Sequence, residues 1–452
     1  MNMRILIIFT FIICGFSHSF GQYTSELLKQ AEAGSPDAQL QLGEVYVSGN
    51  GVARNFSEAL KWFQKSAAQG NTNAMVEIGL MYSEGMGVPV DYSEAVKWFK
   101  LAAENGNVAG MFDLGVAYER GMGVAQDYKE ALKWYLKAAE NGNAMAMWNL
   151  AVYNGNGYGT PVNIQLHNYW IKQSAENGYA DAMSFLGYTY QQGLKNLKDD
   201  REAYKWHQQG AENGNPEAMF YLATCYEKGK GVNQNYPQAI RWYKLAANQG
   251  SGTAMYNLGV LYHTGMGVKQ NKKEALSWYR KASEKGIKKA MTNLGALYAE
   301  GDAIDQDFEE AFRWYEKAAA LGHSLAMYNI GILYSKGKGV QKDMNKATEW
   351  WKKAGENGQI KAFYVLGLES YTGENKPTDY VAAINYFNKV LENQDIMPQY
   401  VITDVYRKLS ACYRFGRGVE KDIAKADELM QKAADFGDVD AQKIQTWLNL
   451  GM

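Results

Sequence analysis

The sequence has little of the residue types on which most catalytic and metal-binding sites depend. Its 452 residues include three cysteines and five histidines, and no Gly-x-x-x-x-Gly-Lys, His-Glu-x-x-His or Cys-x-x-Cys motif occurs. Neither sign of charge is in excess, because the chain has 47 basic and 48 acidic residues. We therefore expect no metal, no cofactor and no nucleic-acid partner, and we predict that the protein is not an enzyme.

The few histidines do not form a recognisable site. Four lie beyond residue 21, and none is at the spacing of metal ligands: His167, His207, His263 and His323. The segment 322–326 faintly resembles the Gly-x-Ser-x-Gly turn of hydrolases, but that turn joins a strand to a helix. Here the segment falls between two predicted helices, so we interpret it as a structural turn.

Long hydrophobic runs are absent beyond the N-terminus, so we expect no membrane insertion. The first residues have the order of an export signal: Arg4, an apolar stretch from Ile5 to Cys14, and small residues before Gln22. The apolar stretch is about half as long as a membrane span requires. We predict a signal peptide over residues 1–21 and a secreted or periplasmic protein. A lipoprotein anchored through Cys14 is the alternative, although Ile13 stands where that signal normally has a small residue.

What the sequence has in abundance is a repeat. A Leu-Gly-x-x-Tyr motif or a close variant recurs every 36 residues. Its second position is Gly, or Ala in two repeats, and falls at 43, 79, 115, 151, 187, 223, 259, 295, 331 and 367. A tryptophan follows 19 residues after each of the first nine, so nine of the twelve tryptophans share one structural role.

The third repeat shows how one unit is built. The spacing predicts a first helix over 107–119, a Gly-rich turn at 121–124 and a second helix over 127–141. Met111, Leu114, Gly115 and Tyr118 form an apolar stripe at helical period. Neither helix can bury its stripe alone, so neighbouring repeats must stack.

The full pattern, Ala-Met-x-x-Leu-Gly-x-x-Tyr-x-x-Gly-x-Gly-Val followed by Asp-x-x-x-Ala-x-x-Trp-Tyr-x-Lys-Ala-Ala-x-x-Gly, resembles the Sel-one-like repeat, a relative of the tetratricopeptide repeat. The resemblance covers about residues 35–437. It implies an all-α fold: a right-handed superhelical solenoid of about eleven helix-turn-helix units of 36 residues. It also implies an adaptor that binds proteins on the concave surface of the first helices. Cysteine-rich relatives linked to β-lactam binding carry paired cysteines that this sequence lacks.

The pattern divides the chain into segments. A lone helix at 22–34 is expected to cap the first of ten repeats, which occupy 35–394. Seven extra residues, 395–401, precede the eleventh repeat at 402–437, and residues 438–452 are expected to form a C-terminal capping helix. Cys225 and Cys412 occupy the same repeat position five repeats apart, so we predict two separate buried thiols and no disulfide.

The candidate binding residues lie just before the Leu of the motif in repeats 4, 7, 8 and 9. In the resembling family, an Asn at this place hydrogen-bonds the backbone of a bound peptide. The predicted peptide-binding set, with the neighbouring aromatic residues, is Asn149, Asn257, Asn293, Asn329, Trp148, Tyr256 and Tyr328. The alternative is that the amides hydrogen-bond the backbones of neighbouring helices and the rings pack only between repeats.

Together these observations predict an exported scaffold or adaptor, expected to be a monomer, that captures a partner protein or peptide of unknown identity. The alternative is an envelope enzyme or carbohydrate-binding protein that uses exposed aromatic rings. Clustered carboxyl groups of perturbed pKa in one pocket would favour that alternative.

Overall fold

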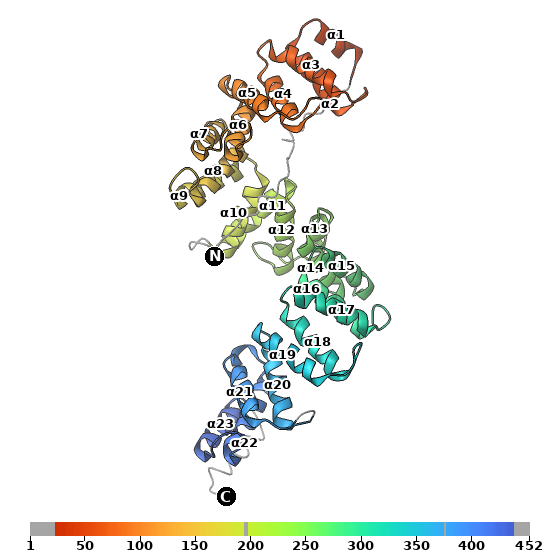
Figure 1. Cartoon of the computed structure of the whole chain (residues 1–452), viewed down its shortest axis with the longest axis vertical. Helices are drawn as coiled ribbons and strands as arrows, with labels where there is room; N and C mark the ends of the chain where they lie inside the picture. Colours follow the sequence, from red (N-terminus) through yellow and green to blue (C-terminus); the bar gives the residue numbers. More distant parts are fainter. Residues whose placement is uncertain (1–22, 194–197, 375–376, 438–452) are drawn as a thin grey trace. The chain divides into compact units, whose positions relative to one another are not determined.

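The computed structural model describes residues 23–193, 198–374 and 377–437, which form 23 α-helices and no strand (Figure 1). The chain divides into two compact units, residues 1–221 and 222–452. The predicted signal peptide and the predicted C-terminal capping helix at 438–452 lie outside the described residues. Within the described part, no helix is long and apolar enough to cross a membrane.

Each repeat is a pair of antiparallel helices, which we call A and B in chain order. In the first unit, α1 (Ser25–Glu32) precedes five such pairs. The A helices are α2 (Pro36–Ser48), α4 (Thr72–Glu84), α6 (Val108–Arg120), α8 (Ala144–Asn156) and α10 (Ala180–Gln192). The B helices are α3 (Phe56–Ala67), α5 (Tyr92–Glu104), α7 (Tyr128–Glu140), α9 (Ile164–Glu176) and α11 (Asp200–Glu212).

The next A helix, α12 (Pro216–Lys228), contains the boundary between the units. The second unit continues the alternation. Its A helices are α14 (Gly252–Thr264), α16 (Lys288–Glu300), α18 (Ser324–Lys336), α20 (Ile360–Thr372) and α22 (Gln399–Phe415). Its B helices are α13 (Tyr236–Asn248), α15 (Lys272–Glu284), α17 (Phe308–Ala320), α19 (Met344–Glu356), α21 (Tyr380–Leu391) and α23 (Ile423–Asp435). The prediction of an all-α solenoid of paired helices is confirmed.

The helix ends follow from local chemistry. The Asp127 carboxylate accepts hydrogen bonds from the backbone N–H groups of Lys129 and Glu130 and caps α7. Gly121 ends α6 at φ +68°, a left-handed conformation that favours glycine. The second glycine of the turn, Gly123, has a different reason: a Cβ there would lie 2.2 Å from the carbonyl oxygen of Tyr92 in the preceding B helix. The turn of one repeat therefore packs on the start of the previous B helix.

The glycine of the Leu-Gly motif makes room for a ring. A Cβ on Gly115 would lie 2.7 Å from the Tyr135 ring, and one on Gly79 would lie 2.5 Å from the Phe99 ring. Tyr135 is fully buried. The recurring tryptophan is more exposed, with a lysine ammonium above its ring, as in Trp134 and Lys137 at 4.0 Å. The ring that fills the core of the repeat is thus the residue after the tryptophan.

Most of the extra residues before repeat 11 are helical. Gln394–Ile396 form a short 3-10 turn, and α22 then runs for 17 residues where the other A helices have 13. Pro398 stands directly before α22, where its missing N–H costs nothing. The expected insertion therefore lengthens one helix by about a turn. Cys225 and Cys412 are buried and unbridged, as predicted.

Candidate functional site

The A helices present one column of half-buried side chains, which we call the A-helix row. It holds the residue two positions before the recurring Gly or Ala. In the first unit its described members include Glu77, Asp113, Asn149, Phe185 and Tyr221, and in the second Asn257, Asn293, Asn329 and Val365. All four predicted asparagines belong to this row, and three of them occupy successive repeats of one unit.

Each asparagine of the row is tied to a tyrosine of the preceding B helix. The Asn257 amide N–H donates to the Tyr243 hydroxyl at 2.9 Å, and that hydroxyl donates to Glu227 Oε2 at 2.5 Å. Asn149, Asn293 and Asn329 act on Tyr135, Tyr279 and Tyr315 in the same way, and each amide opposes the rise in pKa that burial causes at its tyrosine. Burial and, to a smaller extent, the nearby Glu227 carboxylate raise the pKa of Tyr243, so the hydroxyl stays protonated and donates a hydrogen bond to Glu227.

This tie fixes what the asparagines can offer a ligand. One N–H of Asn257 is used by Tyr243, and the amide oxygen and the second N–H remain. The contact is to a side chain of the adjacent repeat, whereas the alternative that we considered was a bond to helix backbone. The packing role is therefore observed, and peptide contact by the same residues stays a prediction.

The predicted aromatic residues differ in exposure. Trp148 is half-buried, with its ring 5.9 Å from that of Tyr179 and 5.8 Å from that of Phe185. Tyr256 is half-buried against Tyr279, at 6.0 Å between ring centroids. Tyr328 is buried, with 8% of its surface exposed. Of the three rings, Trp148 and Tyr256 have surface left for a ligand.

Two members of the row are carboxyl groups that the sequence analysis missed. In the B helices that precede Glu77 and Asp113, Phe63 and Phe99 stand where four other repeats have a tyrosine, so no hydroxyl is available there. Neither carboxyl has a hydrogen-bond or ion-pair partner among residues 23–193. Burial, with Glu44 and Glu84 nearby, raises the pKa of Glu77 to about 7. Burial and the Glu77 charge likewise raise the pKa of Asp113 to about 7. The row thus contains two carboxyls that are costly to ionise.

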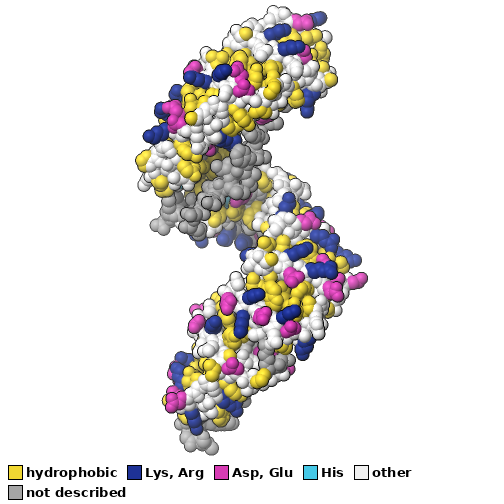
Figure 2. Space-filling view, in the orientation of Figure 1, with side chains coloured by type: hydrophobic (Ala, Val, Ile, Leu, Met, Phe, Trp, Pro, Cys, Tyr) yellow, Lys and Arg dark blue, Asp and Glu magenta, His cyan; other side chains and the backbone are white. Residues whose placement is uncertain are grey.

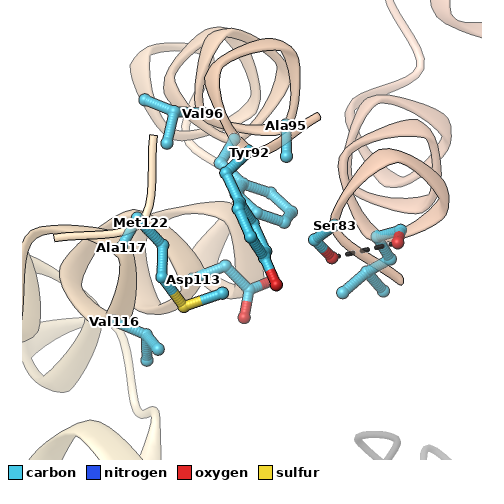
Figure 3. A pocket seen from close by; sticks show the side chains of 10 residues that line it. Ser83, Tyr92, Ala95, Val96, Asp113, Val116, Ala117 and Met122 are labelled. Atoms are coloured by element: carbon cyan, nitrogen blue, oxygen red, sulfur yellow. Dashed lines mark hydrogen bonds between the residues drawn. The ribbon is translucent and has the colours of Figure 1, made fainter. Parts of the chain in front are cut away.

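Asp113 lies in the wall of a cavity of about 50 Å³ between repeats 2 and 3 (Figure 3). The other lining residues are Leu80, Ser83, Tyr92, Ala95, Val96, Phe99, Val116, Ala117 and Met122. One junction further along the chain, the equivalent side chains are larger. There Tyr135 replaces Phe99 and Glu119 replaces Ser83, and their side chains are hydrogen-bonded to each other. Repeat 2 thus carries the smaller side chain at both of these places beside the cavity.

Three of the histidines contact side chains or backbone of neighbouring helices. His323 stands directly before α18, and its Nδ1 lies 2.7 Å from the Thr292 hydroxyl on α16. His167 Nδ1 lies 2.7 Å from the Ala151 carbonyl oxygen. His207 is fully buried and stacks on Tyr221 at 4.9 Å. In the parts of the chain that the structure describes, no three His, Cys, Asp or Glu side chains are grouped as metal ligands.

Comparison with known proteins agrees with this architecture. The Sel1 repeat profile matches eleven stretches: 36–71, 72–107, 108–143, 144–179, 180–215, 216–251, 252–287, 288–323, 324–359, 361–394 and 404–438. No curated protein matches the chain significantly.

Two solved structures are similar over much of their length. One is c5321, a protective antigen of uropathogenic Escherichia coli with an SLR fold. It is 30% identical with a TM-score of 0.80, and the match covers 94% of this chain and 90% of that one. The other is a Sel1 repeat protein of Oxalobacter formigenes, 30% identical with a TM-score of 0.50 over 68% of this chain and 90% of that one. The chain belongs to the Sel1 repeat family.

Proposed function

We propose that this protein is an exported, non-catalytic scaffold that binds an extended segment of a partner protein along the A-helix row. The observation that carries the proposal is the row itself. In both units it presents half-buried polar groups, and their bonding to the chain leaves acceptor oxygens available: the Asn257 amide oxygen and the Asp113 carboxyl are examples.

The spacing of the row suits an extended chain. Neighbouring helices pack about 8–10 Å apart, and an extended peptide advances about 3.3 Å per residue. One repeat therefore corresponds to about three residues of a bound segment. Amide and carboxylate oxygens accept hydrogen bonds from backbone N–H groups whatever the side chains of the segment are.

The export part of the proposal has two supports. The N-terminal 21 residues have the pattern of a signal peptide. The similar Escherichia coli protein is a protective antigen, a description that suits a protein accessible from outside the cell. Mass spectrometry of the protein from periplasmic and extracellular fractions tests this part. We expect a mature chain that begins at Gln22, and a lipid-modified Cys14 would contradict it.

A photo-crosslinking pair tests the binding part. The photoreactive residue p-benzoylphenylalanine replaces Tyr256, which is half-buried on α14 beside the row. In the control it replaces Ser277, which is exposed on α15 of the same repeat. We expect a covalent adduct with one partner from position 256 and none from position 277. Equal adducts from the two positions would reject the A-helix row as the binding surface.

A carbohydrate-active protein is the second candidate, because Glu77 and Asp113 are carboxyls whose pKa values lie near 7. A raised pKa suits a general acid in glycoside cleavage. Against this, Glu77 is not among the residues that line the cavity. If this candidate holds, purified protein will bind or release soluble envelope glycans, and E77Q and D113N will each abolish the effect.

A further inference from the structure

The cavity between repeats 2 and 3 lacks a polar chain that occurs at two other junctions of the protein. After repeat 6, Glu227, the Tyr243 hydroxyl and Asn257 are hydrogen-bonded in sequence. After repeat 3, the Tyr135 hydroxyl is hydrogen-bonded to Glu119 and interacts with Asn149. At the cavity, the residues in these three places are Ser83, Phe99 and Asp113. The tyrosine hydroxyl is missing, and a carboxyl stands in the place of the asparagine amide.

We propose that this cavity binds the end of a lysine side chain of the partner segment, with its ammonium group on Asp113. The inference rests on the proposed function, since the lysine belongs to a segment bound along the A-helix row. It adds a chemical requirement to that segment: a lysine where the segment crosses repeats 2 and 3.

The lining of the cavity matches a lysine in polarity. Apolar side chains form most of it, and they would contact the methylene stem; Val96, Phe99 and Val116 are examples. The oxygen atoms in the lining side chains belong to Asp113, Ser83 and Tyr92. The Ser83 hydroxyl donates to the Leu80 carbonyl at 3.0 Å, so its lone pairs are left to accept. An ammonium has three N–H donors, and three side chains are available to accept them.

The size of the cavity also favours lysine. A water-sized group occupies about 10–15 Å³ of such a volume, so about 50 Å³ holds a chain of roughly three to five such groups. A guanidinium is a rigid planar fork with five N–H donors, and the acceptors described above would leave part of it unsatisfied. Figure 3 shows the Tyr92 ring beside the cavity and the Asp113 carboxyl directed toward the same space. Tyr92 is 40% exposed, so its ring lies at the opening.

Charge complementarity supports the same occupant. The groups that face Asp113 from neighbouring helices are Glu77 on α4 and the Tyr92 hydroxyl on α5, and no basic group acts on its titration. Glu44 on α2 and Glu84 at the end of α4 act in turn on Glu77. This part of the row is therefore acidic, and an incoming cation lowers the cost of ionising Asp113.

The first test uses n-butylammonium, which reproduces the lysine side chain, and 1-butanol, its neutral counterpart. Binding to the mature full-length chain is measured by ligand-observed NMR titration. We expect D113N to weaken butylammonium binding about tenfold or more while butanol binding changes less than about twofold. Since the pKa of the empty-site carboxyl is about 7, wild-type affinity for butylammonium should rise about tenfold from pH 6 to pH 8. Affinity that is absent, unchanged in D113N or independent of pH overturns the proposal.

The double variant F99Y/D113N is the matched control. It installs the Tyr–Asn pair that the chain already uses at four other junctions, so we expect it to fold, as judged by circular dichroism. It places a hydroxyl in part of the cavity and removes the carboxyl. Binding of butylammonium should be lost, and retained binding of butylammonium would overturn the assignment of the site.

A second measurement identifies the source of the ammonium. Adduct formation from p-benzoylphenylalanine at position 148, which is half-buried on α8 in the same unit as Asp113, is compared between the wild-type background and D113N. Weaker capture in D113N supports a lysine of the partner, and unchanged capture overturns that source. If adducts form at position 256 but butylammonium does not bind, the cavity proposal fails alone. If no adduct forms while butylammonium binds, the scaffold proposal fails.

Discussion

Replacing Asp113 by asparagine should stabilise the N-terminal unit above neutral pH. The pKa of this carboxyl is raised from 3.8 to about 7 by burial and by Glu77. A carboxyl with a raised pKa in the folded state contributes stability that is present in full below pH 3.8 and is lost as the pH rises through about 7. The asparagine variant has no proton to lose, so its stability does not follow this course.

The magnitude follows from the pKa. At about 1.4 kcal/mol per pH unit, a change from 3.8 to about 7 corresponds to about 4 kcal/mol. Asp113 is half-buried, and solvent screening reduces this to about 1–2 kcal/mol. The advantage of D113N over wild type should therefore grow by about 1–2 kcal/mol between pH 4 and pH 8.

The assay compares wild type and variant at both pH values. Because repeat proteins unfold in parts, urea unfolding is combined with amide hydrogen exchange of peptides from α5 and α6, which reports local opening. E140Q, at an exposed position near the end of α7, is the control and should show no pH-dependent difference. If the difference between D113N and wild type is the same at pH 4 and pH 8, the reasoning about the buried carboxyl is refuted.

Three further substitutions test the packing account. N257A should lower the free energy of unfolding by about 1 kcal/mol, because it removes the hydrogen bond to Tyr243; a silent change in urea titrations would count against the observed tie. G267A should cost about 2–4 kcal/mol, since its φ is +70° and its Cβ would lie 1.9 Å from Tyr236 Cβ; a melting curve equal to wild type would contradict this. Burial lowers the pKa of His207 to about 4, so wild type should lose up to about 3 kcal/mol as the pH falls from 6.5 to 4. H207F should not, as unfolding at the two pH values will show.

The fold could be predicted because its signals are local and repeated. The helices expected at 107–119 and 127–141 are observed at Val108–Arg120 and Tyr128–Glu140. Each end of these two helices has a capping side chain or a left-handed glycine within two residues of it. The same signals recur every 36 residues, so a helix boundary that is unclear in one repeat can be predicted from the equivalent position in the next.

The site could be predicted only in part, because its chemistry depends on contacts between repeats. The asparagine column is visible in the sequence, but the tyrosine that binds Asn257 lies 14 residues earlier on another helix. The asparagine pattern does not include Asp113, because an acidic residue stands there in the asparagine's place. Asp113 becomes a candidate site residue only when the structure places it near Phe99. The hydroxyl that Phe99 lacks leaves a cavity and a carboxyl without a hydrogen-bond partner.

Carboxyl footprinting tests the central claim, binding along the A-helix row, most directly. The mature protein is labelled with a carbodiimide and an amine, alone and in complex with the partner captured at position 148 of the same unit. Mass spectrometry then compares Glu77 and Asp113 of the row with Glu130 and Glu140 on the B helix α7. We predict that the partner reduces labelling of Glu77 and Asp113 and leaves Glu130 and Glu140 unchanged. Protection of the α7 carboxyls with unchanged labelling of the row would contradict the account.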